Sequence, residues 1–197
     1  MKGFAFFMKY FIKENSYLMF KMFVNQLGMT IFAITLTFAT TQNDTLFLIV
    51  SIFSILFYMV LLYFMTWDIG FEDKTRIDAG RMKFLPLKGL YLSLFANIPN
   101  IILALMITVG DYGASSFNAA GYPSSPEWAV NAYGVGKVVA GLLEAMYTGI
   151  INIWFGPSPW AYFTIIAPAL ITCMIAYVMG VKGLRVFPPS KNEYSKE

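Results

Sequence analysis

Acidic side chains are the main candidates for chemistry, because this 197-residue chain contains no histidine and a single cysteine, Cys173. The lack of histidine excludes His-based acid/base catalysis, His metal ligands and Ser-His or Cys-His nucleophilic pairs. Asp68 and Glu72 have helical spacing, so a helix would place both carboxylates on one face, with Asp73 nearby. This group has two interpretations, a divalent cation site or a set of acids paired with nearby basic residues. We favour ion pairing and predict no metal.

Nucleotide-binding and hydrolase motifs are also missing from the sequence. No Walker-type GxxxxGK[ST], GxGxxG, HExxH, GxSxG or CxxC pattern occurs. We therefore predict a protein that is not an enzyme and has no cofactor.

Glu144 is the only acid within an extended apolar segment. Ionisable residues inside a membrane are functional candidates by default. The residues around it form two adjacent rows at helical spacing, which are Gly141, Ala145 and Gly149 in one row and Glu144, Thr148 and Asn152 in the other. These rows predict one small, polar helix face that packs closely against another helix.

Other polar side chains recur within apolar runs. Asn25 and Gln26 lie about one turn inside the first run, and Asn97 and Asn100 flank Pro99 in the third. Amides at membrane depth require partners on a neighbouring helix, and Pro99 predicts a kink because it removes a backbone donor. We expect packing contacts, with a substrate-binding role as the alternative.

The composition explains why these polar residues are unusual. The chain is 58% hydrophobic, 18% aromatic and 13% charged, with a formal net charge of +3. Such a chain is typical of an integral membrane protein, and its small net charge predicts no nucleic-acid partner. The fold class is therefore predicted as all-α and polytopic, in a single membrane domain.

The apolar runs define the expected elements. Transmembrane helices are predicted at 17-40, 46-66, 90-110 and 161-181. The remaining segments are an interfacial helix at 1-16, a cytoplasmic loop at 67-89, an extracytoplasmic loop at 111-136, an interfacial or re-entrant helix at 137-154 and a cytoplasmic tail at 182-197. The segment from Phe71 to Ala79 within the first loop is a candidate short helix.

Positive charge orients these elements. Of the 14 Lys and Arg residues, all except Lys137 lie in the N-terminal region, the 67-89 loop or the tail. The positive-inside rule then places both termini and the loop in the cytoplasm. Two termini on one side require an even number of crossings, so 137-154 is not expected to cross. A five-span topology is the alternative. Short tails and no processing signal favour a bacterial plasma membrane.

The 67-89 loop is the expected contact surface. Trp67, Arg76, Arg81 and Lys83 combine aromatic and basic character in a segment that also carries several apolar side chains. This mixture suits contact with anionic membrane lipids or with a protein partner. A protein partner could also bind through packing between helices. We therefore predict a non-catalytic accessory subunit of a larger membrane assembly or transporter, with a stand-alone small-molecule or ion transport protein as the alternative.

Overall fold

The computed structural model describes residues 2–40, 42–120, 124–156 and 158–186, which form helices without any β-strand. Four segments are long and apolar enough to cross a membrane, namely Phe6–Thr40, Asp44–Asp78, Ile98–Ala119 and Ala161–Lys182. A bent pair, Glu127–Leu143 with Ala145–Phe155, is the fifth candidate. The prediction of an all-α fold with four possible spans and one further helical segment is confirmed.

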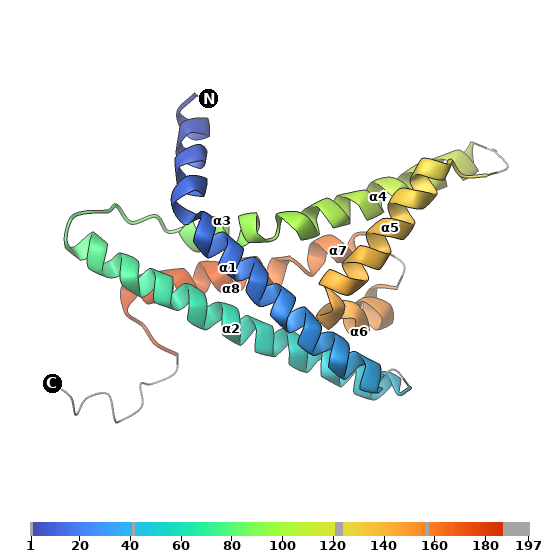
Figure 1. Cartoon of the computed structure of the whole chain (residues 1–197), viewed down its shortest axis with the longest axis horizontal. Helices are drawn as coiled ribbons and strands as arrows, with labels where there is room; N and C mark the ends of the chain where they lie inside the picture. Colours follow the sequence, from blue (N-terminus) through green and yellow to red (C-terminus); the bar gives the residue numbers. More distant parts are fainter. Residues whose placement is uncertain (1, 41, 121–123, 157, 187–197) are drawn as a thin grey trace.

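The two longest helices, α1 (Lys2–Thr40) and α2 (Asp44–Asp78), pack as an antiparallel pair (Figure 1). The Asn43 side chain begins α2 by accepting hydrogen bonds from the N–H groups of Thr45 and Leu46, at 3.0 and 3.1 Å. At 39 and 35 residues, the helices are about 58 and 52 Å long. A bilayer's hydrocarbon core is only about 30 Å thick, so each helix extends beyond it.

These lengths correct two predicted boundaries. The segment 1-16 is not a separate helix, because α1 runs unbroken into the predicted span 17-40. The predicted loop 67-89 is helical up to Asp78, which leaves only residues 79–87 between α2 and α3 (Lys88–Ala96). The physical reason lies in the charges of this region. Glu72 and Arg76, which carry opposite charges at four-residue spacing, support a helix in water, and the left-handed Gly80, with φ of 71°, follows its end.

Most of the charged side chains among the described residues lie at one end of the molecule, which we call the charged end. The start of α1 meets α3 there, since the Phe11 and Tyr91 rings lie 5.8 Å apart. The end of α2 meets the end of α8 (Ala167–Lys182), where Gly70 packs on Gly180. The start of α1, the end of α2, the start of α3 and the end of α8 therefore share one end. Their cytoplasmic location remains a prediction.

The predicted third span, 90-110, is divided in the structure. α3 ends at Ala96, and α4 (Ile98–Ala119) begins after an interruption at Asn97. Pro99 explains the break, because it cannot donate a backbone hydrogen bond and fits the first turn of a new helix. The expected kink is thus a short gap in the helix just before the proline.

The predicted extracytoplasmic loop 111-136 is largely helical. α4 continues to Ala119, and α5 (Glu127–Leu143) starts soon after. Figure 1 shows the two helices as a hairpin that extends away from the α1–α2 pair. Gly110 and Gly113 of α4 lie directly against α5. Close packing between the helices outweighs the weak helix propensity of this Gly- and Ser-rich stretch. Residues 121–123 of the predicted loop lie outside the described residues.

The segment after α5 turns sharply. At Glu144 the chain bends by 90° into the 3₁₀ turn η1 (Ala145–Tyr147), the single turn α6 (Thr148–Ile150) and the π-helical η2 (Ile151–Phe155). Gly149 then packs against Phe47 and Ser51, near the start of α2 and far from the charged end. The bent pair is either one broken span or a re-entrant segment, so both interpretations of 137-154 stay predictions.

The last predicted span, 161-181, is also interrupted. α7 (Ala161–Thr164) precedes α8, with Ile165 and Ile166 between them. Pro168 lies in the first turn of α8, so it starts a helix where a mid-helix kink was expected. α8 packs between α2 and α3. Of the predicted tail, residues 187–197 lie outside the described residues.

Candidate functional site

A buried ion pair lies at the charged end. The Lys88 ammonium, at the start of α3, donates to Asp73 Oδ2 of α2 at 2.6 Å. The Tyr177 hydroxyl of α8 donates to the same oxygen at 3.0 Å. Asp73 is 2% exposed and Lys88 is 7% exposed. This group of three residues, which we call the Asp73 cluster, joins three helices through one carboxylate.

Two cavities lie between α1 and α2, and the cluster borders the first of them. One of about 340 Å³ is lined by Glu14 and Asn15 of α1 and by Glu72, Asp73 and Lys88 across from them. The other, of about 390 Å³, lies further along the α1–α2 interface, between Lys21 and Asn25 on α1 and Asp68 and Glu72 on α2. Acids and bases of both helices therefore line the groove between α1 and α2, together with apolar side chains such as Leu18 and Ile69. Among the described residues, no group of three or more His, Cys, Asp or Glu side chains is placed to hold a metal ion.

The predicted contact residues differ in their environments. Trp67 is buried, and its indole Nε1 donates to the Leu184 carbonyl at 2.6 Å while its ring stacks on Phe71 at 5.2 Å. Its contacts in this structure are within the chain. Arg76 lies 3.9 Å from Asp73 but is 61% exposed.

Arg81 and Lys83 occupy the segment 79–87 and are both exposed. Within the described part of the chain, neither forms an ion pair. These two cations are thus available to a partner or to lipid.

The amides of the broken third span are buried together. Asn97 Nδ2 donates to the Ser93 carbonyl at 2.9 Å, and Asn100 Nδ2 donates to Asn97 Oδ1 at 2.9 Å. Asn100 Oδ1 is buried without a hydrogen-bond partner. The break at Asn97 is therefore stabilised locally, and one acceptor is left over in the interior.

The bend after α5 is held by side chains of α1. Thr30 Oγ1 donates to the Leu143 carbonyl at 2.7 Å, and Gln26 Nε2 approaches the same oxygen at 3.5 Å. The bend removes this carbonyl's helical partner, because the N–H of Tyr147 donates to Glu144 instead. A buried backbone carbonyl that loses its helical partner needs a substitute donor, which α1 supplies. Asn25 points elsewhere, and its Nδ2 is buried without a partner.

Glu144 itself lies at the bend. It is 2% exposed, and neither carboxylate oxygen has a hydrogen-bond partner. Burying an unpaired charge in a low-dielectric interior is costly. A proton or another cation must therefore accompany this carboxylate whenever it is buried in this arrangement.

Two tyrosines, Tyr133 and Tyr162, interact with the basic residue Lys137. Lys137 Nζ lies 3.2 Å from the Tyr133 hydroxyl, one turn earlier on α5. Tyr162 of α7 interacts electrostatically with Lys137, Tyr133 and Glu144. Lys137 is only partly buried. The charges of both Lys137 and Glu144 thus act on Tyr162, a relation that residue spacing along α5 alone does not reveal.

The small-residue face is only partly formed. The bend divides the rows, so Gly141 meets nothing within 4 Å, whereas a Cβ on Gly149 would lie 2.3 Å from Ser51 Oγ. Gly149 packs against α2. Ala145 is buried, Thr148 donates to the Ala145 carbonyl, and Asn152 is exposed. The 90° turn redirects residues that a straight helix would have aligned.

Sequence reasoning missed the Asp73 cluster and the acid Glu14 of the groove. Lys88 and Asp73 are separated by the segment 79–87, and no local pattern relates them. The one available signal was that Lys88 directly precedes the apolar run of the third span. Comparisons with protein families, with curated proteins and with solved structures give no match for this chain.

Proposed function

We propose that this chain is a non-catalytic membrane transport protein, acting alone or as the membrane subunit of a larger transporter, in which Glu144 takes up and releases a proton. The observation that carries the proposal is the burial of the Glu144 carboxyl at a helix bend, with no partner for either oxygen. Acids of this kind form proton relays in pumps and transporters. Irregular backbone at membrane depth is also typical of transport sites.

Two further features support a proton as the cation. A single carboxyl offers few ligands to a metal ion, whereas one proton neutralises it completely. Tyr162 is within electrostatic range of Glu144 and of the Tyr133–Lys137 pair, and we infer that these hydroxyl and amine groups carry the proton between a partly exposed position and Glu144.

We expect Glu144→Gln to abolish proton flux while leaving the protein folded. Glutamine keeps the shape of the side chain but cannot exchange a proton at this position, and it removes an unpaired acid from the interior. Proteoliposomes that contain a pH-sensitive dye, with an imposed potassium diffusion potential, would report the flux. The thermal unfolding temperature in detergent should stay equal or rise.

Glu127→Gln is the matched control, because Glu127 is an exposed acid at the start of the same helix. It should transport protons like the wild-type protein. Wild-type flux no greater than that of empty vesicles would contradict the proposal, as would full flux in the Glu144 variant.

A second candidate function is assembly with a protein partner at the charged end. Arg81 and Lys83 favour this function, because both are exposed and neither has an acid partner among the described residues. The nearby acid Asp73 is already bound to Lys88. Their exposed position is compatible with a partner or with anionic lipid headgroups.

We expect Arg81→Ala to weaken co-purification of such a partner by about 30-fold or more, as truncation of a charge paired across an interface costs about 2 to 5 kcal/mol. Single alanine changes at Lys74, Arg76 and Lys83 are the comparison set. One or two dominant positions would favour a protein. Small, uniform losses in liposome binding would favour lipid, at about 1 kcal/mol per cation. No loss at any position would contradict this candidate.

A further inference from the structure

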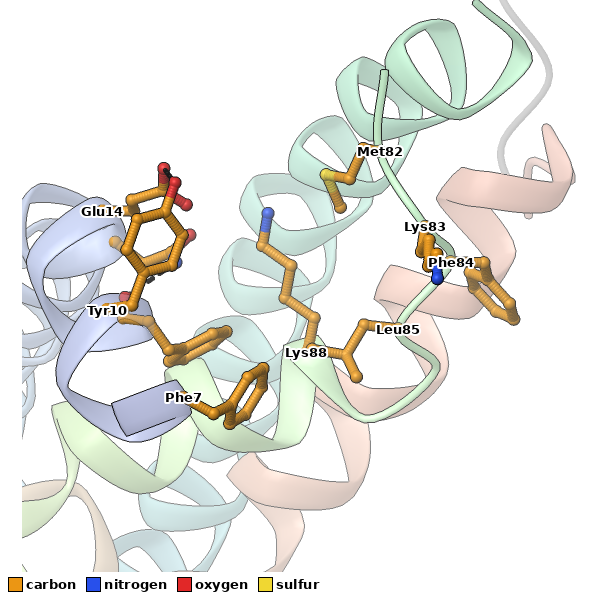
Figure 2. Close-up of a pocket in the computed structure, with 10 residues that line it drawn as sticks. Phe7, Tyr10, Glu14, Met82, Lys83, Phe84, Leu85 and Lys88 are labelled. Atoms are coloured by element: carbon orange, nitrogen blue, oxygen red, sulfur yellow. Dashed lines mark hydrogen bonds between the residues drawn. The ribbon is translucent and has the colours of Figure 1, made fainter. Parts of the chain in front are cut away.

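A third cavity at the charged end is lined by two elements that face each other. α1 contributes Phe7, Tyr10, Phe11 and Glu14 to one wall, and the segment 79–87 contributes Met82, Lys83, Phe84 and Leu85 to the other. Figure 2 shows the Lys88 side chain between these walls. The volume of this cavity is about 240 Å³. The cavity is thus part aromatic and part charged.

Charges of opposite sign stand on opposite walls. Glu14 lies on the α1 side, where it accepts a hydrogen bond from Tyr10, and Lys83 lies across from it (Figure 2). Lys88 gives one N–H to Asp73, and an ammonium has three donors. The lining therefore offers cation donors at one side and a carboxylate with aromatic rings at the other.

The size and place of the cavity restrict the ligand. A cavity of about 240 Å³ is far larger than the roughly 10 to 15 Å³ that holds one water molecule by the same measure, which leaves room for a lipid headgroup. The exposed apolar residues Phe7 and Phe84 at its rim would keep acyl chains in the bilayer beside it. Amphipathic protein surfaces of this kind lie at the headgroup level.

We propose that this cavity binds the headgroup of a zwitterionic phospholipid, with the phosphate at Lys83 and Lys88 and the primary ammonium of an ethanolamine headgroup at Glu14. The separated charges of the two walls match the separated charges of the headgroup. The ammonium donates to Glu14, and the faces of Phe7, Tyr10 and Phe11 attract it further. This site is independent of proton transfer at Glu144.

The test compares two lipids with identical palmitoyl and oleoyl chains. Native mass spectrometry of the full chain in detergent would measure binding of phosphatidylethanolamine and of phosphatidylglycerol, whose headgroup has a phosphate but no ammonium. We expect the ethanolamine lipid to bind about tenfold more tightly, the effect of one charge-assisted hydrogen bond.

Variants separate the two halves of the site. Glu14→Gln should remove the preference by weakening only the ethanolamine lipid, whereas Lys83→Gln should weaken both lipids. Asp78→Asn, an exposed acid at the end of α2 that does not line this cavity, should retain the preference. Equal or tighter binding of phosphatidylglycerol by the wild-type protein would overturn the proposal, and so would an unchanged preference in Glu14→Gln. Because Glu14 is exposed, its variant is expected to fold normally.

Discussion

Replacing Lys88 with methionine is expected to destabilise the protein by about 3 to 5 kcal/mol, because it leaves Asp73 as a buried and uncompensated charge. Asp73 is 2% exposed, and its remaining close donor is the Tyr177 hydroxyl at 3.0 Å. Arg76 at 3.9 Å is too exposed to replace the lost ammonium. Asp73→Asn should have a comparable effect by stranding the Lys88 ammonium.

The double variant Asp73→Asn, Lys88→Met provides the decisive comparison. With both charges removed, no ion is stranded, so the double variant should be more stable than either single variant. Thermal unfolding in detergent would measure all three. Arg76→Ala is the control, since an exposed pair contributes only about 0 to 1 kcal/mol. Additive losses in the double variant would show that Asp73 and Lys88 are not coupled.

This ion pair illustrates what the sequence could and could not predict. The apolar runs predicted the four long helices because hydrophobic length is a local property that membrane thickness constrains directly. Lys88 was assigned to a loop, since a lysine beside a span ordinarily reaches water. Its burial depends on Asp73 and Tyr177, which tertiary packing brings together from distant segments.

At the candidate site around Glu144, local features were likewise predictable from the sequence and tertiary contacts were not. Glu144 stood out in the sequence because a single acid in an apolar run is visible locally. Its lack of hydrogen-bond partners and its relation to Tyr162 depend on the 90° bend. No proline or glycine at the bend predicts it from the sequence. The bend also explains why Gly141 and Gly149 face different surroundings. Helical periodicity places residues on one face only while the helix is straight, so it does not predict which residues share a face across a bend.

The contact between α2 and α8 is closer than any residue pattern suggested. A Cβ built on Gly180 would lie 2.2 Å from the Trp67 carbonyl oxygen, and one on Gly70 would lie 2.3 Å from the Tyr177 carbonyl oxygen. Both obstacles are backbone atoms, so a side-chain rotation cannot relieve the clash. Small residues allow membrane helices to approach this closely. The same approach positions Tyr177 next to Asp73 and Trp67 next to Leu184.

We therefore expect Gly180→Ala to destabilise the protein by about 3 kcal/mol or more, the upper part of the range for overpacking, because the two helices must separate. Gly28→Ala is the matched control, since Gly28 also lies within a long helix but a Cβ there meets nothing within 4 Å. That variant should be stabilised by about 0.5 to 1 kcal/mol, as alanine favours a helix over glycine. Thermal unfolding in detergent would compare the two. If Gly180→Ala were as stable as Gly28→Ala, α2 and α8 could not be in direct backbone contact at Gly70, and the geometry that buries Asp73 would be wrong.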